Sequence, residues 1–407
     1  MNHHYDYAVI WAWPWWLTVA IWLWAVGKKV CLIEKWHIGG DCTNYGCVPS
    51  KALLSFAKTH SWSRVRDAMT YVREKREEIR EEETPEILSE YWVDIILGKA
   101  SFEDEHTLKI EYQDDISHIQ AKKIIIATWS HPRKLEIQWV TSWDVLTSET
   151  LFEVESDIKK LVIIGWGVIA CEMAEAFCGL GVNVTIVAKH DRLLSREEPE
   201  VSAFMHAHLQ TCWVTIHYKS TAQEAHWKKL LVQGGDGRVA ELPYDKILVA
   251  IGRTPNTDSL GLEKAGIEVD SWWVIVDVKN RTALPHVFAI GDCVSWNPKF
   301  THRANNEWRI LVQNVLSPIP FWSSIKWHPL PMTIYTSYEV WRVWLTEQQA
   351  KEKYWEDLIE VCTLPFSKND RSKLEETTHG FIKISMKRVT LKICLLYTSP
   401  SPRDDIS

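Results

Sequence analysis

The chain has 407 residues and a formal net charge of −7, with 46 basic and 53 acidic side chains mixed along it. This length allows two or three domains with well-buried cores, and the mixed charge argues against a broad nucleic-acid-binding surface. The nine cysteines are widely scattered, unlike the framework of a small secreted protein. We therefore expect a cytoplasmic protein, in which a disulfide is more often catalytic than structural.

Tryptophan is out of proportion, because the chain has 24 Trp against only 17 Gly, and glycine is normally among the commonest residues. Many of these tryptophans stand where a turn favours glycine, as in Thr-Trp-Ser at 128–130 and Gly-Trp-Gly at 165–167. We hypothesise that many of these positions are glycine in the natural protein. A genetic code that reads UGA as Gly, translated with UGA as Trp, produces this pattern. UGG codons at Trp11 and Trp13 would contradict the hypothesis.

The segment Tyr7–Val26 contains twenty residues without a charge and has two interpretations. Taken literally, it is long enough to span a bilayer or to act as a signal anchor. With glycine at Trp11, Trp13 and Trp16, it becomes a strand, a G-x-G-x-x-G turn and a helix, followed by a second strand ending at Glu34. Glycine lets the backbone approach a pyrophosphate, and the acid binds the ribose. We favour this dinucleotide-binding unit, with the membrane anchor as an alternative.

Two cysteines, Cys42 and Cys47, stand in the segment IGGDCTNYGCVPSKALL at 38–54. A Cys-x4-Cys pair can close a small disulfide loop, and Pro49 suits the first turn of a helix. A thiolate at a helix N-terminus has a lowered pKa. The pattern indicates a redox-active pair. A structural disulfide and two unrelated buried thiols are the alternatives.

A second dinucleotide unit lies between Leu161 and Val187, where an apolar strand leads into the turn Gly165-x-Gly167-x-x-Ala170, a helix and another strand. A complete strand–turn–helix–strand unit makes this motif specific. The second strand is followed by Lys189 and Arg192 rather than by an acid. Because basic residues suit a 2′-phosphate, NADPH is favoured over NADH. The alternative is that both are solvated loop charges.

The cysteine segment resembles the active-site segment of the flavin-dependent pyridine nucleotide–disulfide oxidoreductases. Similarity extends to ATWS at 127–130, to IGRTPN at 251–256, to AIGDCV at 289–294 and to the stretch from Pro320 onward. The resemblance covers Tyr5 to about Lys387. It implies an α/β fold with two Rossmann-like dinucleotide-binding domains, for FAD and NAD(P), plus a partial α+β dimerisation domain.

The domain boundaries implied by this resemblance place FAD binding in 1–145 and 267–318 and NAD(P) binding in 146–266. The partial dimerisation domain covers 319–390. The last residues, 391–407, are polar and turn-rich without periodicity, and we expect a non-native or disordered tail there.

The resemblance also implies roles for individual residues. Hydride passes from NAD(P)H to FAD, which then opens the Cys42–Cys47 disulfide; Cys47 forms the charge-transfer thiolate and Cys42 exchanges with substrate. Lys51 lies near the flavin and pairs with Glu172, although an ordinary surface pair is the alternative. The remaining cofactor-binding positions, besides those in the two glycine motifs, are Glu34, Gly40, Thr128, Asp292, Lys189 and Arg192. No metal-binding residues are predicted.

The substrate implied by the resemblance is a small disulfide or dithiol, or a metal ion, as in dihydrolipoamide dehydrogenase or mercuric reductase. Members form homodimers, and we expect neither a nucleic-acid nor a membrane partner. A histidine that relatives supply to the partner subunit has no counterpart in this sequence, so we expect poor turnover of a disulfide. A degenerate or mistranslated chain unable to hold FAD is the alternative function.

Overall fold

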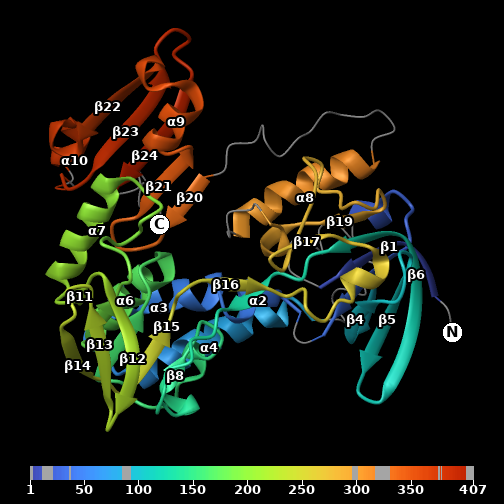
Figure 1. Cartoon of the computed structure of the whole chain (residues 1–407), viewed down its shortest axis with the longest axis horizontal. Helices are drawn as coiled ribbons and strands as arrows, with labels where there is room; N and C mark the ends of the chain where they lie inside the picture. Colours follow the sequence, from blue (N-terminus) through green and yellow to red (C-terminus); the bar gives the residue numbers. More distant parts are fainter. Residues whose placement is uncertain are drawn as a thin grey trace. The chain divides into compact units, whose positions relative to one another are not determined.

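The computed structural model describes residues 3–11, 22–35, 38–84, 93–295, 301–316, 331–374, 376 and 378–399 (Figure 1). The chain divides into two compact units, one made of residues 1–49, 73–131 and 253–328 and the other of residues 50–72, 132–252 and 329–407. The divisions at 131/132 and 252/253 differ from the predicted boundaries at 145/146 and 266/267. One reason is that β8 (Val145–Leu146) pairs with β15 (Lys246–Val249) in the second unit.

The first unit is built on a seven-stranded sheet in the order β3-β2-β1-β6-β5-β4, with β19 also paired to β6. Its strands are β1 (His3–Ile10), β2 (Val30–Glu34), β3 (Asp94–Leu97), β4 (Lys99–Phe102), β5 (Thr107–Tyr112), β6 (Asp115–Ile126) and β19 (Val287–Ala289). All pairings are parallel except those of β5 with β4 and β6. Continuous apolar strands such as β2 are buried on both faces, as parallel sheets require.

One edge of this sheet collects the residues that follow β1, β2, β6 and β19, because parallel strands end on the same side. Trp11, Glu34, Thr128 and Asp292 come at or just after these ends. Ligands of open α/β sheets bind at this edge. Helices α2 (Gly40–Asn44) and α8 (Thr301–Leu316) belong to the same unit, while α3 (Cys47–Thr59) and α4 (Val65–Glu81) each run from one unit into the other.

The second unit contains a five-stranded parallel sheet in the order β11-β10-β9-β15-β8. Its elements are β9 (Lys160–Ile164), α6 (Val168–Gly179), β10 (Asn183–Val187), α7 (Pro199–Thr211) and β11 (Thr215–His217). An antiparallel sheet of β12 (Ser220–His226), β13 (Lys229–Gly234) and β14 (Val239–Pro243) follows. The predicted α/β class with two Rossmann-like sheets is confirmed.

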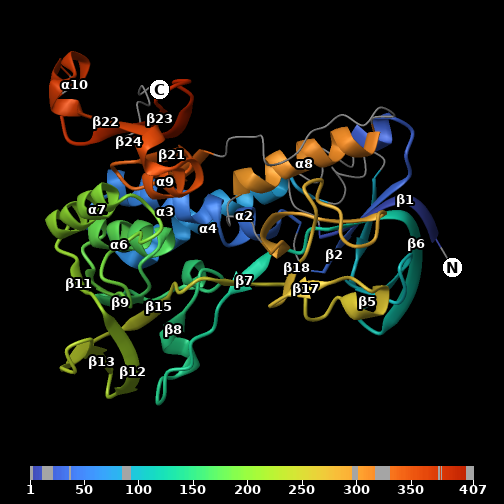
Figure 2. The same cartoon turned by 45° about the horizontal axis from the view of Figure 1, so that its top comes forward.

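The C-terminal sheet of the second unit is antiparallel, in the order β20-β21-β24-β23-β22, and shares a hydrophobic core with α6 and α7 (Figure 2). Its elements are β20 (Pro331–Ile334), β21 (Val340–Trp344), α9 (Glu347–Tyr354), β22 (Ile359–Pro365), α10 (Asp370–Leu374), β23 (Phe381–Lys387) and β24 (Ile393–Ser399). Short elements complete the chain: β7 (Ser130–Pro132), β16 (Arg253–Pro255), β17 (Val269–Asp270), β18 (Trp273–Val274), η1 (Ser142–Asp144), η2 (Leu151–Glu153), η3 (Leu262–Ala265), η4 (Gly291–Cys293), η6 (Glu356–Leu358) and η7 (Phe366–Lys368).

Strand β24 corrects the expectation of a tail without regular structure from residue 391. It lies between β21 and β23 and pairs with both. Leu395 and Tyr397, two residues apart and therefore on one face, are fully buried. The alternation is short and lies in a polar, turn-rich segment, so periodicity alone did not predict it, although one partner, β23, ends only shortly before it in the sequence. Residues 400–407 lie outside the described part.

Nine of the seventeen non-glycine residues with positive φ in the described chain are tryptophans. They are Trp11, Trp62, Trp129, Trp139, Trp213, Trp227, Trp272, Trp344 and Trp355. A bulky residue rarely adopts this conformation, whereas glycine does so without a steric penalty. The backbone therefore supports the hypothesis that these positions are glycine.

The membrane-anchor alternative receives no support from the described helices, none of which is long and apolar enough to cross a bilayer. Tyr7–Ile10 belong to β1 of the first unit. Residues 12–21 of that segment, including Trp13 and Trp16, lie outside the described residues.

Candidate active site and nucleotide-binding edges

The cysteine pair lies where α2 gives way to α3, within the first unit. Cys42 is on α2 and Cys47 is the first residue of α3. Both are half-buried, and no disulfide joins them. Hydrogen bonding with Cys47, followed by burial and the nearby charge of Asp41, raises the pKa of Cys42. A raised pKa favours the protonated form of Cys42.

Helix α2 is held in place by Asn44. The Asn44 side chain donates to the Gly40 carbonyl oxygen at 2.7 Å and accepts from Arg80 Nε of α4 at 2.7 Å. Gly39, before the helix, has a φ of 96° and packs so tightly that a Cβ there would lie 2.9 Å from Thr43 Cβ. This turn needs glycine, and it orients the helix that carries Cys42.

Arg253 joins the cysteine segment to the sheet edge of the same unit. Its Nη2 lies 3.1 Å from Asp41 Oδ1, and its Nε donates to Ser130 Oγ at 2.6 Å. Ser130 in turn donates to Asp292 Oδ2 at 2.6 Å. The side chains of Arg253, Asp41 and Asp292 are only 14%, 15% and 3% exposed. Sequence reasoning missed Arg253; a charged residue one glycine after the apolar run ILVAI was the available signal.

The predicted FAD residues fit the polar ends of a dinucleotide. Glu34 and Asp292 are buried at the ends of β2 and β19, where a ribose and a ribityl chain would find acceptors. Thr128 is also buried, and its Oγ1 finds no hydrogen-bond partner within the described chain. Because a buried unpaired hydroxyl is costly, it points to a ligand. The Gly291 amide, next to Asp292, donates to Glu307 at 2.7 Å.

The side chains of two tryptophans are too bulky for the close approach between backbone and ligand that a flavin dinucleotide needs. The indole of Trp129 lies against Gly291, since a Cβ on that glycine would be 3.0 Å from Trp129 Cζ3. Trp11 has a φ of 92°, and Lys35 Nζ lies 4.8 Å from its ring centroid. Glycine at both positions would remove this bulk. Of the other predicted FAD positions, Gly40 begins α2 with a φ of 55°.

The second nucleotide turn is intact. Gly165 has a φ of 152°, and a Cβ there would clash with the Ala250 carbonyl oxygen. Gly167 caps α6 with open space around it, and Ala170 is fully buried one turn later. The strand β10 ends two residues before the exposed Lys189, and the half-buried Arg192 donates to the Ser195 carbonyl oxygen at 3.0 Å.

Lys51 and Glu172 are brought together within the second unit. Lys51 Nζ lies 2.9 Å from Glu172 Oε2, with side-chain exposures of 36% and 4%. The backbone N–H of Tyr335 donates to Glu172 Oε1 at 2.9 Å, and Lys51 Nζ lies 4.4 Å from the Tyr335 ring centroid. Because Glu172 is buried and interacts with both Lys51 and the Tyr335 amide, the Lys51–Glu172 pair is not an ordinary surface ion pair. The role of Lys51 beside a flavin stays a prediction.

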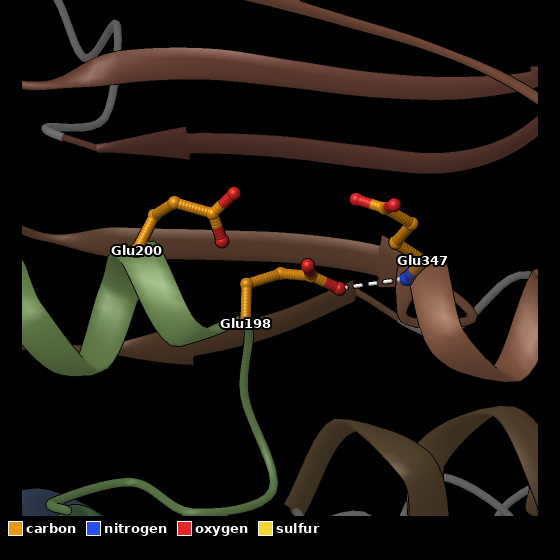
Figure 3. A group of neighbouring side chains, drawn as sticks. All are labelled: Glu198, Glu200 and Glu347. Atoms are coloured by element: carbon orange, nitrogen blue, oxygen red, sulfur yellow. Dashed lines mark hydrogen bonds between the residues drawn. The ribbon is translucent and has the colours of Figure 1, made fainter.

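Three carboxylates, those of Glu198, Glu200 and Glu347, converge at the starts of α7 and α9 (Figure 3). Lys383 Nζ of β23 lies 2.7 Å from Glu198, 2.8 Å from Glu200 and 2.7 Å from Glu347. Burial disfavours its charge, but these carboxylates raise the pKa of Lys383. An ammonium group thus occupies the centre where a cation would otherwise bind, so this group is an ion-pair network joining three elements.

Two Rossmann-like sheets, each with a nucleotide-binding edge, and a dithiol at a helix N-terminus define a class of two-nucleotide thiol oxidoreductases. Residues 17–307 match the family described as "Pyridine nucleotide-disulphide oxidoreductase", and residues 330–394 match the dimerisation domain of that family. The chain belongs to this family, whose members are FAD-dependent and use NAD(P)H. The predicted family is confirmed.

Individual relatives differ in their substrates. A mercuric reductase from Bacillus cereus is 30% identical over 413 residues, covering 96% of this chain and 64% of the relative. A dihydrolipoyl dehydrogenase from Geobacillus stearothermophilus is 30% identical over 381 residues, covering 89% of this chain and 80% of the relative. The HOCl-induced flavoprotein disulfide reductase RclA from Escherichia coli superposes with a TM-score of 0.84 at 26% identity, covering 97% of this chain and 89% of that structure. The chain thus spans less than two thirds of the Bacillus cereus mercuric reductase.

Proposed function

We propose that this chain is an FAD-dependent NAD(P)H:disulfide oxidoreductase in which electrons reach substrate through Cys42 and Cys47. The observation that carries the proposal is the hydrogen-bonded pair itself, with Cys42 on α2 and Cys47 at the first position of α3.

The chain's own residues would divide the work as follows. The flavin, when bound, supplies the transfer of an electron pair from NAD(P)H to the disulfide. Cys47, at a helix N-terminus, is suited to hold the thiolate. Cys42 is the exchanging thiol, and it must lose its proton before it attacks a substrate disulfide. Because the pKa of Cys42 is raised, this step would benefit from a base near its thiol.

Small disulfides and thiophilic metal ions are the substrates we infer, since both react with a dithiol. Mercuric reductase and dihydrolipoyl dehydrogenase among the relatives support both classes. We further propose a cytoplasmic homodimer that prefers NADPH. The dimerisation-domain match supports the dimer, the scattered unlinked cysteines support the compartment, and Lys189 with Arg192 supports the coenzyme.

Thiol counting after reduction tests the proposal. The full chain, reconstituted with FAD and air-oxidised, is treated anaerobically with NADPH and then with a maleimide. We expect NADPH to add two alkylated thiols, which map to Cys42 and Cys47. In Cys47→Ser, NADPH should add no alkylated thiol at these positions. The exposed Cys362 offers a control, because Cys362→Ser should leave this gain unchanged. Protein that retains FAD but gains no thiols would overturn the proposal.

A non-catalytic chain unable to hold FAD is the second candidate, and Trp129 against Gly291 favours it. The variant with glycine at 11, 13, 16 and 129 discriminates. If the glycine variant binds FAD and the chain as written does not, the tryptophans cause the loss of FAD binding, and the proposed function applies to the glycine form. If neither binds FAD, the second candidate is correct.

A further inference from the structure

A second pair of cysteines lies in the second unit, away from any residue assigned above. Cys178 is the last residue but one of α6, and Cys212 caps the C-terminal end of α7. Helices α6 and α7 pack together, and the Cys178 thiol contacts the Cys212 carbonyl oxygen. Both residues are half-buried, and no disulfide joins them.

Each helix places an ionisable side chain one turn before its cysteine. Glu175 precedes Cys178 on α6, and His208 precedes Cys212 on α7, spacings that share a helix face. Glu175 Oε2 and His208 Nε2 lie 3.1 Å apart, with side chains 10% and 8% exposed. The other oxygen, Glu175 Oε1, accepts the Ser337 amide at 2.7 Å, which fixes the carboxylate.

The charges of this group favour one reactive sulfur. Burial disfavours an imidazolium, but the Glu175 carboxylate raises the pKa of His208. Hydrogen bonding with Cys178 lowers the pKa of Cys212 to about 6, and His208 assists. The same hydrogen bond raises the pKa of Cys178. The Tyr338 ring lies edge-on to His208 at 5.0 Å and covers it.

The other cysteines of this unit, Cys171, Cys362 and the buried Cys394, lack these features. Cys171, also on α6, is fully buried, and burial raises its pKa. Cys362 is exposed, and it lies on β22, away from the α6–α7 contact. Reactive cysteines are partly exposed and lie near cations. Cys212 is half-buried with His208 one turn before it, and the favourable effect of His208 and Cys178 on its thiolate exceeds the opposing charge of Glu175.

We propose that Cys178 and Cys212 are a second redox dithiol, in which Cys212 is the nucleophile toward peroxides and Cys178 the resolving thiol. The Cys212 thiolate attacks one peroxide oxygen, so that an S–O bond forms and the O–O bond breaks; the leaving hydroxide takes a proton and becomes water. The Cys178 sulfur then attacks the Cys212 sulfur, and the S–O bond breaks with release of a second water. The dithiol loses two hydrogens and two electrons, and hydrogen peroxide gains them. The resulting disulfide links α6 to α7.

The test uses the full chain carrying Cys42→Ser and Cys47→Ser, so that the outcome does not depend on the proposed function. One equivalent of hydrogen peroxide is added, remaining thiols are blocked, and peptides are mapped by mass spectrometry. We expect a cross-linked peptide pair containing Cys178 and Cys212. With Cys178→Ser, Cys212 should instead accumulate as a sulfenic acid trapped by dimedone. Oxidation of Cys212 no faster than that of Cys362 would overturn the proposal.

A second measurement separates a chemical role for His208 from a structural one. The rate of Cys212 alkylation by iodoacetamide is followed against pH in Cys178→Ser and in Cys178→Ser with His208→Asn. We expect the midpoint to rise in the second variant, because the cation that favours the thiolate is gone. An unchanged midpoint in a folded His208→Asn protein would show that His208 does not activate Cys212.

Discussion

At the scale of single residues, Trp227 shows the mismatch between side chain and backbone most clearly. Trp227 and Lys228 form the two-residue turn between β12 and β13, with φ values of 50° and 60°. Positive φ at both positions is the type I′ geometry, which favours Asn-Gly and Gly-Gly. The indole is 95% exposed and contributes little packing. Trp227→Gly should therefore raise the free energy of unfolding by about 1 kcal/mol.

Urea unfolding measures this gain, and Trp143→Gly is the matched control. Trp143 is 83% exposed but has no positive φ, so glycine there should be neutral or destabilising by up to about 1 kcal/mol. Equal effects at both positions would contradict the strain argument. Codons add an independent check, since the glycine hypothesis expects UGA at Trp227.

Arg253 is the residue on which three groups of the first unit depend. Without it, Asp41 and the nearly buried Asp292 lose their shared cation, and Ser130 loses a donor. Arg253→Met should lower the free energy of unfolding by about 3 kcal/mol, because an uncompensated buried carboxylate is costly. It should also slow reduction of the Cys42–Cys47 disulfide by NADPH.

Denaturant unfolding and the thiol count measure the two effects, with Arg238→Met as the control. Arg238 is 90% exposed and pairs only with Asp236 at 3.4 Å among its described contacts, so its loss should change stability by less than about 0.5 kcal/mol. If Arg253→Met changed the free energy of unfolding as little as this control, the contacts of Arg253 with Asp41, Ser130 and Asp292 would not stabilise the fold.

At the scale of elements, Lys383 connects β23 to the first turns of α7 and α9. Its side chain is 2% exposed and neutralises Glu198, Glu200 and Glu347. Lys383→Met keeps the length of the side chain but removes the cation. We expect a loss of about 3 kcal/mol at pH 7, because the buried Glu198 then loses the charge of Lys383, while Glu347 keeps Lys351.

The pH dependence of that loss identifies its cause. Burial opposes ionisation of Glu347, but hydrogen bonds from Lys351 and Lys383 lower its pKa below the ordinary value of 4.5. A lowered native pKa stabilises the fold above that ordinary value and ceases to do so as pH falls through the native pKa. The difference between wild type and Lys383→Met, measured by unfolding, should therefore shrink below about pH 4.5. A constant difference down to acid pH would point to packing instead.

Strand β24 contributes the central strand of the C-terminal sheet, and Leu395 anchors it. Leu395 is fully buried in the core shared with α6 and α7. Leu395→Ala should cost about 2–5 kcal/mol of unfolding free energy through lost burial and a cavity. Leu391, which lies between β23 and β24 and is 66% exposed, should tolerate Ala within about 0.5 kcal/mol. If both changes were neutral in thermal unfolding, residues 391–399 would not be part of the folded sheet.

At the scale of the whole molecule, local patterns predicted the two parallel sheets, while contacts between distant segments stayed hidden. Gly165 and Ala170 are close together in the sequence, so the strand, the glycine motif and the helix can be predicted from the sequence alone. Arg253 meets Asp41 across 212 residues, and Lys383 meets Glu198 across 185. The periodicity of the sequence does not predict contacts between residues so far apart. β24 was missed for a different reason, because it is short and lies in a polar, turn-rich segment, although its partner β23 is the strand just before it.

We expect coenzyme choice to depend on the second unit, so that a substitution there changes it without altering Cys42 and Cys47. Lys189 follows β10 at the nucleotide-binding edge and is exposed, so it can meet the 2′-phosphate of NADPH. Lys189→Glu should raise the KM for NADPH about tenfold or more and leave the KM for NADH unchanged or lower.

Steady-state kinetics of the FAD-loaded glycine form with each coenzyme measure this shift. The control is the reaction of Cys42 and Cys47 with dithiothreitol, which requires no nucleotide and should proceed at the same rate in both proteins. Lys229→Glu, on the antiparallel sheet of the same unit, removes an equally exposed lysine and should leave both KM values unchanged. If Lys189→Glu left the preference for NADPH intact, Lys189 would be a solvated loop charge, and the second dinucleotide edge would need another source of coenzyme selectivity.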